Sequence, residues 1–192
     1  MSYLDQSVAQ LKVFEGVVPW MYLDGERLVT VGVGKMLPSP ADACMLPFRN
    51  DRGGAWDDEV VADYRRVAGM KPGMVAAAYY VEGCVTLAPA DISALLMKTV
   101  TDFDVALHGL FVGFDDFPEP AKVALLDMIY NLGLHGLTAY RNLRSAIASW
   151  TWTEAAAECH RRGPSQARND WTMEQFLEAA SEVQKATSGG TI

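Results

Sequence analysis

The chain has 192 residues, half of them hydrophobic, which is enough to bury one substantial core or two lobes that share a connecting element. Its formal net charge is −8 at pH 7, and its 16 Lys and Arg residues are too few for a phosphate-binding surface, so the composition argues against nucleic-acid binding. Three cysteines without C-x-x-C spacing favour reduced thiols over a disulfide framework or a zinc knuckle.

The N-terminal segment predicts a helix that ends on an acidic residue. Ser2 and Asp5 have the spacing of a capping box, apolar residues then recur at helical spacing, and Gly16 supplies a C-terminal stop. This places Glu15 in the last turn. The segment lacks the basic start and apolar run of a signal peptide, and no later segment approaches a membrane span. We therefore expect synthesis in the cytoplasm and no stable membrane insertion.

A hairpin is expected after this helix. Residues 19–23 and 27–33 read as two short strands around Asp24-Gly25, a dipeptide typical of tight hairpin turns. Residues 38–54 are rich in Pro, Asp, Asn and Gly, which indicates a loop or an insertion. The remaining predictions for this half are a short helix at 58–68 and a segment at 74–87 that fits no class.

The second half of the sequence reads as a series of helices. Pro89 can open a long helix with apolar residues along one side, and at roughly 1.5 Å per residue such a helix spans about 28 Å, enough to connect two lobes. The stretch ALLDMIYNL is apolar nearly all round, which predicts a buried central helix. The predicted helices are 89–108, 119–133, 139–150, 151–162 and 165–186, followed by a frayed tail from 187 to 192.

The hairpin region carries the residues that could perform chemistry. Glu15, Asp24 and Thr30 form an E-x8-D-x5-T pattern in which the first acid closes a helix and the other two lie on a hairpin that can fold over the helix end. Hydrolysis of a glycosidic bond needs an acid to protonate the leaving oxygen and a carboxylate across the bond to activate or orient water. The pattern can supply both, although Asp-Gly also suits a plain turn and such spacings recur by chance.

This segment resembles the catalytic hairpin of phage-type lysozymes, glycoside hydrolase family 24. In that family a helix-ending Glu, a hairpin Asp and a following Thr precede a Gly-x-Gly, as Glu15, Asp24, Thr30 and Gly32-Val33-Gly34 do here. A second resemblance lies in LAPADISALLMKTVTDFDVALHGL, which looks like the family's long interlobe helix. ALLDMIYNLGLHGLTAYRNLRSAIASWTWTEAA looks like its buried central helix and the two elements that follow. Together the resemblances cover the hairpin and most of residues 87–180.

The resemblance implies an α+β fold that is mostly α: a two-lobed, lysozyme-like fold with a small N-terminal β hairpin, a helical C-terminal lobe and a cleft between the lobes. It implies one catalytic domain over residues 1–192. Residues 36–86 match nothing in the family, and whether they shape substrate recognition or add a structural layer stays open. The expected parts are an N-terminal lobe at about 12–88 with an insertion at about 36–86, an interlobe helix at about 89–108 and a helical lobe at about 109–186.

The resemblance also implies the roles of individual residues. Glu15 would be the general acid, Asp24 would activate water and stabilise the developing positive charge, and Thr30 would help hold that water. Arg168 resembles a family arginine at a helix start that pairs with the catalytic Glu; an ordinary surface arginine is the alternative. Such a guanidinium would lower the pKa of Glu15, whereas a general acid benefits from a raised pKa.

Three further residues are candidates for substrate binding or support. Gly32 suits a turn or a close backbone approach. Asn142 contacts substrate by resemblance, with a helix cap as the alternative. Tyr22 and its neighbour Trp20 could stack on sugar rings or pack the hairpin onto its lobe. Lys35 stands where the family often has His, which puts that residue's supporting interaction in doubt.

The implied function is that of a muramidase, a glycoside hydrolase that cuts the β-1,4 bond between N-acetylmuramic acid and N-acetylglucosamine in peptidoglycan glycan strands. Inversion at the anomeric carbon and a monomer without metal or cofactor are expected. Such an enzyme, made in the cytoplasm, fits a phage endolysin or an antibacterial effector that acts in the bacterial periplasm or cell wall. The acidic net charge would slow the encounter of a free enzyme with anionic cell walls, which favours an effector that is delivered as a toxin over an endolysin. The producer of such a toxin would need an immunity or inhibitor protein.

Two rival interpretations come from other classes of protein. A cell-wall-binding or phage-tail structural module on the same scaffold would have lost turnover, because a fold does not dictate a function. A transglycosylase forming an anhydro product would have less need of a second acid. The presence of Glu15, Asp24 and Thr30 together favours the hydrolase over both rivals.

Overall fold

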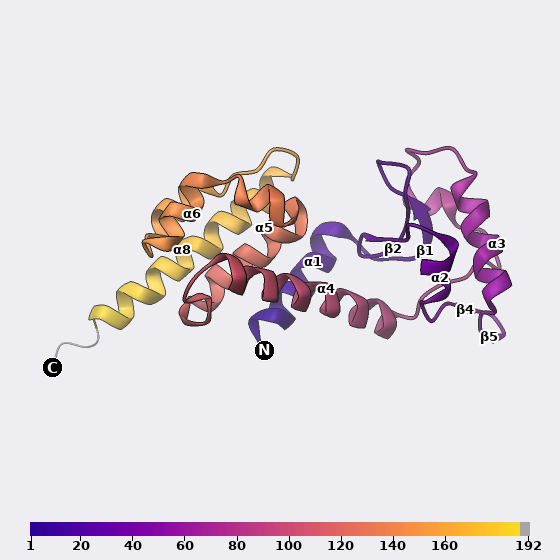
Figure 1. The fold of residues 1–192 in the computed structure, drawn as a ribbon, viewed down its shortest axis with the longest axis horizontal. Helices are drawn as coiled ribbons and strands as arrows, with labels where there is room; N and C mark the ends of the chain where they lie inside the picture. The colour runs from indigo at the N-terminus through magenta and orange to yellow at the C-terminus, as the bar shows by residue number, and fades with distance from the viewer. Residues whose placement is uncertain (189–192) are drawn as a thin grey trace. The chain divides into compact units, whose positions relative to one another are not determined.

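The strands and the helices segregate along the chain. The computed structural model describes residues 1–188, and within them every strand lies in a unit formed by Leu11–Lys98 (Figure 1). The second unit combines Met1–Gln10 with Thr99–Ile192, and its described part is helical. Two helices contribute residues to both units: α1 (Tyr3–Glu15) and α4 (Pro89–Leu110).

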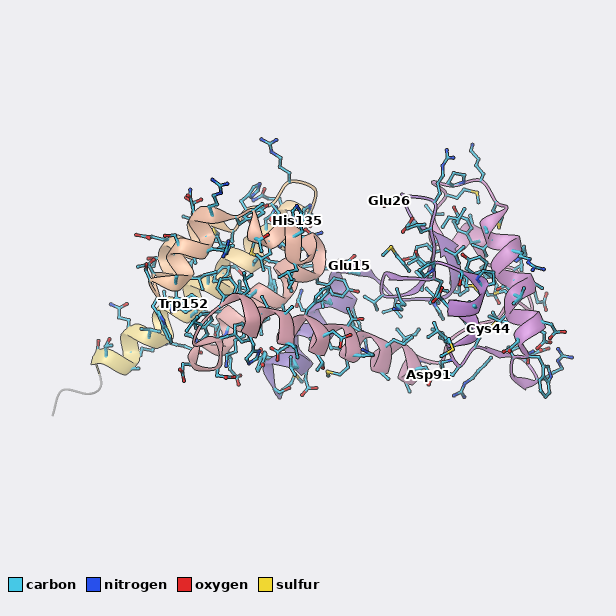
Figure 2. All side chains as sticks on the ribbon, in the orientation of Figure 1. Glu15, Glu26, Cys44, Asp91, His135 and Trp152 are labelled. Atoms are coloured by element: carbon cyan, nitrogen blue, oxygen red, sulfur yellow. The ribbon has the colours of Figure 1, made fainter. Side chains whose placement is uncertain are left out.

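Helix α1 begins and ends as the sequence predicts. The Ser2 hydroxyl accepts a hydrogen bond from the Asp5 amide at 3.2 Å, and the Asp5 carboxylate accepts one from the Ser2 amide at 3.2 Å, which completes the capping box. At the other end Gly16 has a φ of 75° and its amide donates to the Lys12 carbonyl at 3.1 Å. Glu15 is therefore the last helical residue, and its side chain is exposed (Figure 2).

A three-stranded antiparallel sheet follows, in the order β1-β2-β3. Its strands are β1 (Val18–Leu23), β2 (Val29–Gly32) and β3 (Lys35–Met36). The predicted hairpin is confirmed, but its second strand is shorter than the predicted 27–33, and β3 was not predicted. Thr86 forms antiparallel bridges with both Trp20 and Arg49, so it links β1 to a second, two-stranded sheet.

The segment predicted as a loop or insertion is built into the core of this unit. Residues 36–86 contribute buried side chains, among them Ala43 and Tyr79 within short elements and Leu37 and Phe48 between elements. The short elements are two to five residues long, too short to show a hydrophobic period, so of the two alternatives for 38–54 the loop is wrong and the insertion stays a prediction. These elements are α2 (Pro40–Cys44), β4 (Arg49–Asn50), β5 (Gly53–Gly54) and, in the unclassed segment, η1 (Ala76–Tyr79). The predicted short helix is α3 (Asp57–Ala68).

The helical unit is organised around α5 (Glu119–Thr138), which packs against α8 (Gln166–Ser188). Every residue from 120 to 129 is buried, as expected of a central helix. Gly133 breaks the helical backbone where the sequence predicts the end, but the chain returns to helix as far as Thr138. The other elements are η2 (Phe114–Asp116), α6 (Arg141–Ala148) and α7 (Trp152–Glu158).

Two boundaries in this unit differ from the prediction. Helix α7 ends at Glu158 rather than at 162, because the chain turns there to bury Cys159 and Arg161. Helix α8 continues to Ser188, beyond the predicted 186, and the rest of the predicted frayed tail, residues 189–192, lies outside the described part. Aromatic rings fill this core, with Trp152 (Figure 2) stacked on Phe176 at 6.4 Å between ring centroids.

None of the helices in residues 1–188 is both long enough and apolar enough to cross a bilayer. Over the same residues, no group of three or more His, Cys, Asp or Glu side chains is placed to hold a metal ion.

Candidate active site

Asp24 organises the loop of the hairpin with its side chain. Its Oδ1 accepts hydrogen bonds from the amides of Glu26 and Leu28, both at 2.9 Å, and its own amide donates to the Leu28 carbonyl at 3.0 Å. The loop therefore extends from Asp24 to Leu28 and is longer than the three residues, 24–26, that separate the predicted strands. Its positive φ, 67°, falls on Arg27 rather than on Gly25. The backbone amides hold the carboxylate in a fixed orientation.

Thr30 lies across the hairpin from Tyr22 and beside Asp24. In the β1–β2 register Tyr22 pairs with Thr30, and the Thr30 hydroxyl oxygen lies 3.3 Å from Asp24 Oδ2 and 3.1 Å from the Leu28 carbonyl oxygen. The Thr30 side chain is buried, whereas Asp24 is half-buried. A threonine hydroxyl has one proton and two lone pairs, so it can donate to only one of these oxygens and still accept from a water molecule.

The pKa of Tyr22 depends on burial and on both acids. Its pKa is raised above the ordinary tyrosine value, first by burial and then by the negative charges of Asp24 and Glu15. Glu15 is the last residue of α1, and Asp24 is the first residue after β1, so the two acids come from different parts of the chain. The structure thus groups Glu15, Tyr22, Asp24 and Thr30 within the strand-containing unit.

Gly32 holds the end of β2 close to the first turns of α4. Its φ is 71°, and a Cβ built on it would lie 3.4 Å from Cγ2 of Ile92. The backbone conformation would strain any side chain here, and the distance to Ile92 is one of ordinary van der Waals contact, so the positive φ is what favours glycine. The sequence-based interpretation of the Gly-x-Gly as a turn with a close approach is confirmed here. Lys35, at the start of β3, is exposed.

The other two predicted residues belong to the helical unit. Arg168, near the start of α8, is buried, and its Nε donates to Asp127 Oδ1 at 2.8 Å, so the surface alternative is wrong. Its pairing with Glu15 stays a prediction. Asn142 is the second residue of α6, whose N-cap is Tyr140, so the helix-cap alternative is wrong too. Asn142 donates to Glu158 Oε2 at 3.2 Å and lines a cavity of about 340 Å³.

Sequence reasoning missed the ionic network that holds Arg168. Asp127, on α5, accepts hydrogen bonds from Arg161 Nη2 at 2.7 Å through Oδ2 and from Thr172 at 2.9 Å through the same atom, while Arg168 occupies Oδ1. Asn169 exchanges two hydrogen bonds with the backbone of Arg161. The one acid within ALLDMIYNL was the available signal, because an acid in a buried helix needs a cationic partner.

No protein-family model matches the sequence, and no curated protein is similar to it in sequence. Among solved structures, a crystal structure of a P22 lysozyme variant superposes with a TM-score of 0.56. The match covers 92% of this chain and 99% of the P22 lysozyme chain, at 15% sequence identity. The chain has the phage-type lysozyme fold. As predicted, this lysozyme-like fold is α+β and mostly helical, with a small antiparallel sheet near the N-terminus.

Proposed function

We propose that the chain is a peptidoglycan hydrolase, a muramidase that cleaves the β-1,4 bond between N-acetylmuramic acid and N-acetylglucosamine with inversion. The observation that supports the proposal most is the fixed pair of Asp24 and Thr30, whose side-chain oxygens lie 3.3 Å apart on one hairpin. Glu15 ends the preceding helix, and its charge and that of Asp24 act on the same tyrosine. The lysozyme fold is consistent with this activity but does not decide it.

In the proposed mechanism Glu15 is the general acid. It donates its proton to the oxygen of the leaving sugar as the glycosidic bond breaks, which spares that oxygen a full negative charge. Glu15 becomes ionised in this step. Its exposed position gives the side chain access to substrate and lets it take a new proton from solvent after the product leaves.

The attacking water is held by Thr30 and Asp24. The Thr30 hydroxyl can give its one proton to the Leu28 carbonyl, at 3.1 Å, or to Asp24 Oδ2, at 3.3 Å. In either case its oxygen keeps two lone pairs that can accept from the water. Asp24 takes a proton from the water as the water oxygen bonds to the anomeric carbon. Before that transfer its negative charge stabilises the oxocarbenium-like transition state.

Mass analysis of the soluble products from purified peptidoglycan tests the proposal. A muramidase releases fragments that end in reducing N-acetylmuramic acid. Anhydro ends would instead identify a transglycosylase, and the absence of soluble fragments with a folded protein would favour the wall-binding or structural module. Either of these two results contradicts the proposed function.

Replacement of Glu15 by Gln tests the assignment of the general acid. An amide cannot donate the proton, so wall hydrolysis should fall roughly 10²- to 10⁴-fold. The exposed side chain should leave the thermal unfolding midpoint nearly unchanged. Glu26→Gln is the matched control, because Glu26 is an exposed acid of the same hairpin (Figure 2), and we expect wild-type rates. A folded Glu15→Gln protein that keeps most of its activity would remove Glu15 from this role.

We propose further that the protein acts in the periplasm or cell wall as an antibacterial effector. The net charge of −8 slows encounter between a free lysin and an anionic wall, and this handicap is smaller for an enzyme delivered directly into the periplasm. The producer would then need an immunity or inhibitor protein. Export to the periplasm of a test bacterium should cause lysis, and cytoplasmic expression should not. Equal growth in the two cases would argue against this site of action.

A further inference from the structure

We propose that Tyr80, on the segment at 74–87, and Trp20, on β1, form a saccharide-binding platform beside the proposed catalytic acids. This inference deepens the proposed function, because it names a contact for the glycan strand outside the group formed by Glu15, Asp24 and Thr30. The two rings lie 5.0 Å apart between centroids at an interplanar angle of 60°. Tyr80 keeps half of its surface exposed, at 51%.

The platform shares a face of β1 with the catalytic group. From Trp20 to Leu23 burial alternates, with Met21 and Leu23 fully in the core and Trp20 and Tyr22 half-buried. Successive side chains of a strand point to opposite faces, so Trp20 and Tyr22 point the same way. The irregularity in the β1–β2 register lies between Val18 and Tyr22, yet it leaves this alternation intact. Tyr22 pairs with Thr30 across the hairpin, and the Thr30 hydroxyl lies 3.3 Å from Asp24 Oδ2. Trp20 is therefore two residues along β1, about 6.6 Å, from the position that pairs with Thr30.

The segment that carries Tyr80 is hydrogen-bonded to β1 both before and after Tyr80 in the sequence. Before Tyr80, the Ala76 carbonyl accepts a hydrogen bond from Trp20 Nε1 at 2.9 Å. After Tyr80, the Leu87 amide donates to the Pro19 carbonyl at 2.8 Å. The Thr86 bridge to Trp20 adds a third connection. The exposed ring is therefore held in place before any ligand arrives, which lowers the entropy lost on binding.

The chemistry of the surface favours a sugar ring as its occupant. An aromatic ring has a negative face that attracts the weakly positive C–H groups of a pyranose, and the neighbouring Trp20 supports the Tyr80 ring edge-on. A glycan strand that passes the acids along β1 would meet Tyr80 next. The platform should therefore bind a sugar that lies beyond the bond being cut, and it should affect substrate affinity more than the rate of the chemical step.

The test measures binding separately from hydrolysis. Soluble peptidoglycan glycan fragments of defined length are titrated into the Glu15→Gln protein by calorimetry, with and without changes at Tyr80. Tyr80→Ala and Tyr80→Leu should each weaken binding about 3- to 10-fold, since both remove the aromatic face and Leu retains apolar bulk. Tyr80→Phe should retain most of the affinity. Val81→Ala is the control, because Val81 is exposed beside Tyr80 and lacks an aromatic ring.

The outcomes separate this inference from the proposed hydrolase activity. With Glu15 present, Tyr80→Leu should raise KM for glycan strands and leave kcat within about twofold. Unchanged affinity in a folded Tyr80→Leu protein overturns the platform even if the wild type cleaves peptidoglycan. Weakened affinity supports the platform even if the wild type releases no product, a result that would sink the hydrolase proposal alone.

Discussion

Asp24 has a structural role in the hairpin loop and a proposed role at the water site, and a sequence pattern cannot separate the two. Its Oδ1 accepts the amides of Glu26 and Leu28 and so shapes the loop, whereas its Oδ2 lies next to Thr30. A change at Asp24 would disturb both the loop and the proposed water site. Thr30 is the sharper probe, because its hydroxyl can be removed with little change in side-chain shape.

Replacing Thr30 with Val should therefore lower activity without unfolding the protein. The loss of one hydrogen bond to the water in the transition state should reduce kcat about 10- to 100-fold, corresponding to roughly 1.4 to 2.7 kcal/mol. Thr30→Ser keeps the hydroxyl and should retain far more activity. Initial rates of wall hydrolysis and thermal unfolding curves check this expectation. Equal rates for the Val and Ser variants would show that the hydroxyl has no part in the reaction.

For single residues, the sequence predictions succeed where neighbouring residues determine the structure and fail where residues distant in the sequence determine it. The capping box at Ser2 and the glycine at position 32 follow from spacing and backbone conformation, and both are confirmed. The partners of Arg168 and Arg161 come from α5, more than thirty residues earlier, and no local pattern indicates which acid they bind. Tyr80 was missed because its role depends on contact with a strand sixty residues before it.

At the scale of elements, residues 36–86 contribute to the structure of their unit, whether or not they also shape substrate recognition. Phe48, between α2 and β4, is 2% exposed and contributes to the core of its unit. Phe48→Ala should reduce the free energy of unfolding by about 3–5 kcal/mol through lost burial and a new cavity. Met45→Ala, at a position that is 83% exposed, should change it by less than about 0.5 kcal/mol. Denaturant unfolding curves measure both.

The burial of Phe48 also bears on how shortening the segment at 38–54 should affect folding. A surface loop or insertion would tolerate trimming. With Ala43 and Phe48 in the core and Arg49 bridged to Thr86, trimming should instead cause cooperative loss of folding. A Phe48→Ala protein as stable as the wild type would return the segment to the status of a surface insertion.

The α5–α8 pairing rests on charge as well as on apolar packing. Asp127 is the shared acceptor for Arg161 and Arg168, and all three side chains are buried. Asp127→Asn removes the negative charge between two guanidinium groups, so we expect a loss of about 3–5 kcal/mol in the free energy of unfolding. Glu174→Gln, an exposed change on α8, is the control and should be nearly neutral. If the Asn variant were as stable as the wild type, the network would not contribute to the packing of these helices.

For the whole molecule, apolar periodicity predicts the order of the long helices, because such helices are governed by local pattern. The fold class is implied by the resemblance to phage-type lysozymes. The match to P22 lysozyme at 15% identity agrees with that expectation. The short strands β3, β4 and β5 could not be predicted, since two residues show no period and depend on neighbouring strands for their hydrogen bonds. Activity, unlike fold, rests on whether Asp24 and Thr30 hold a water opposite Glu15.

The stereochemistry of the product tests that central claim most directly. An acid and a water-activating carboxylate on opposite sides of the bond invert the anomeric carbon, whereas attack by a carboxylate on that carbon retains its configuration. Proton NMR during the first minutes of hydrolysis of a β-linked glycan strand, before mutarotation mixes the anomers, distinguishes the two. We predict that the α anomer appears first. Initial release of the β anomer would contradict the water site at Thr30 and would make Asp24 the nucleophile.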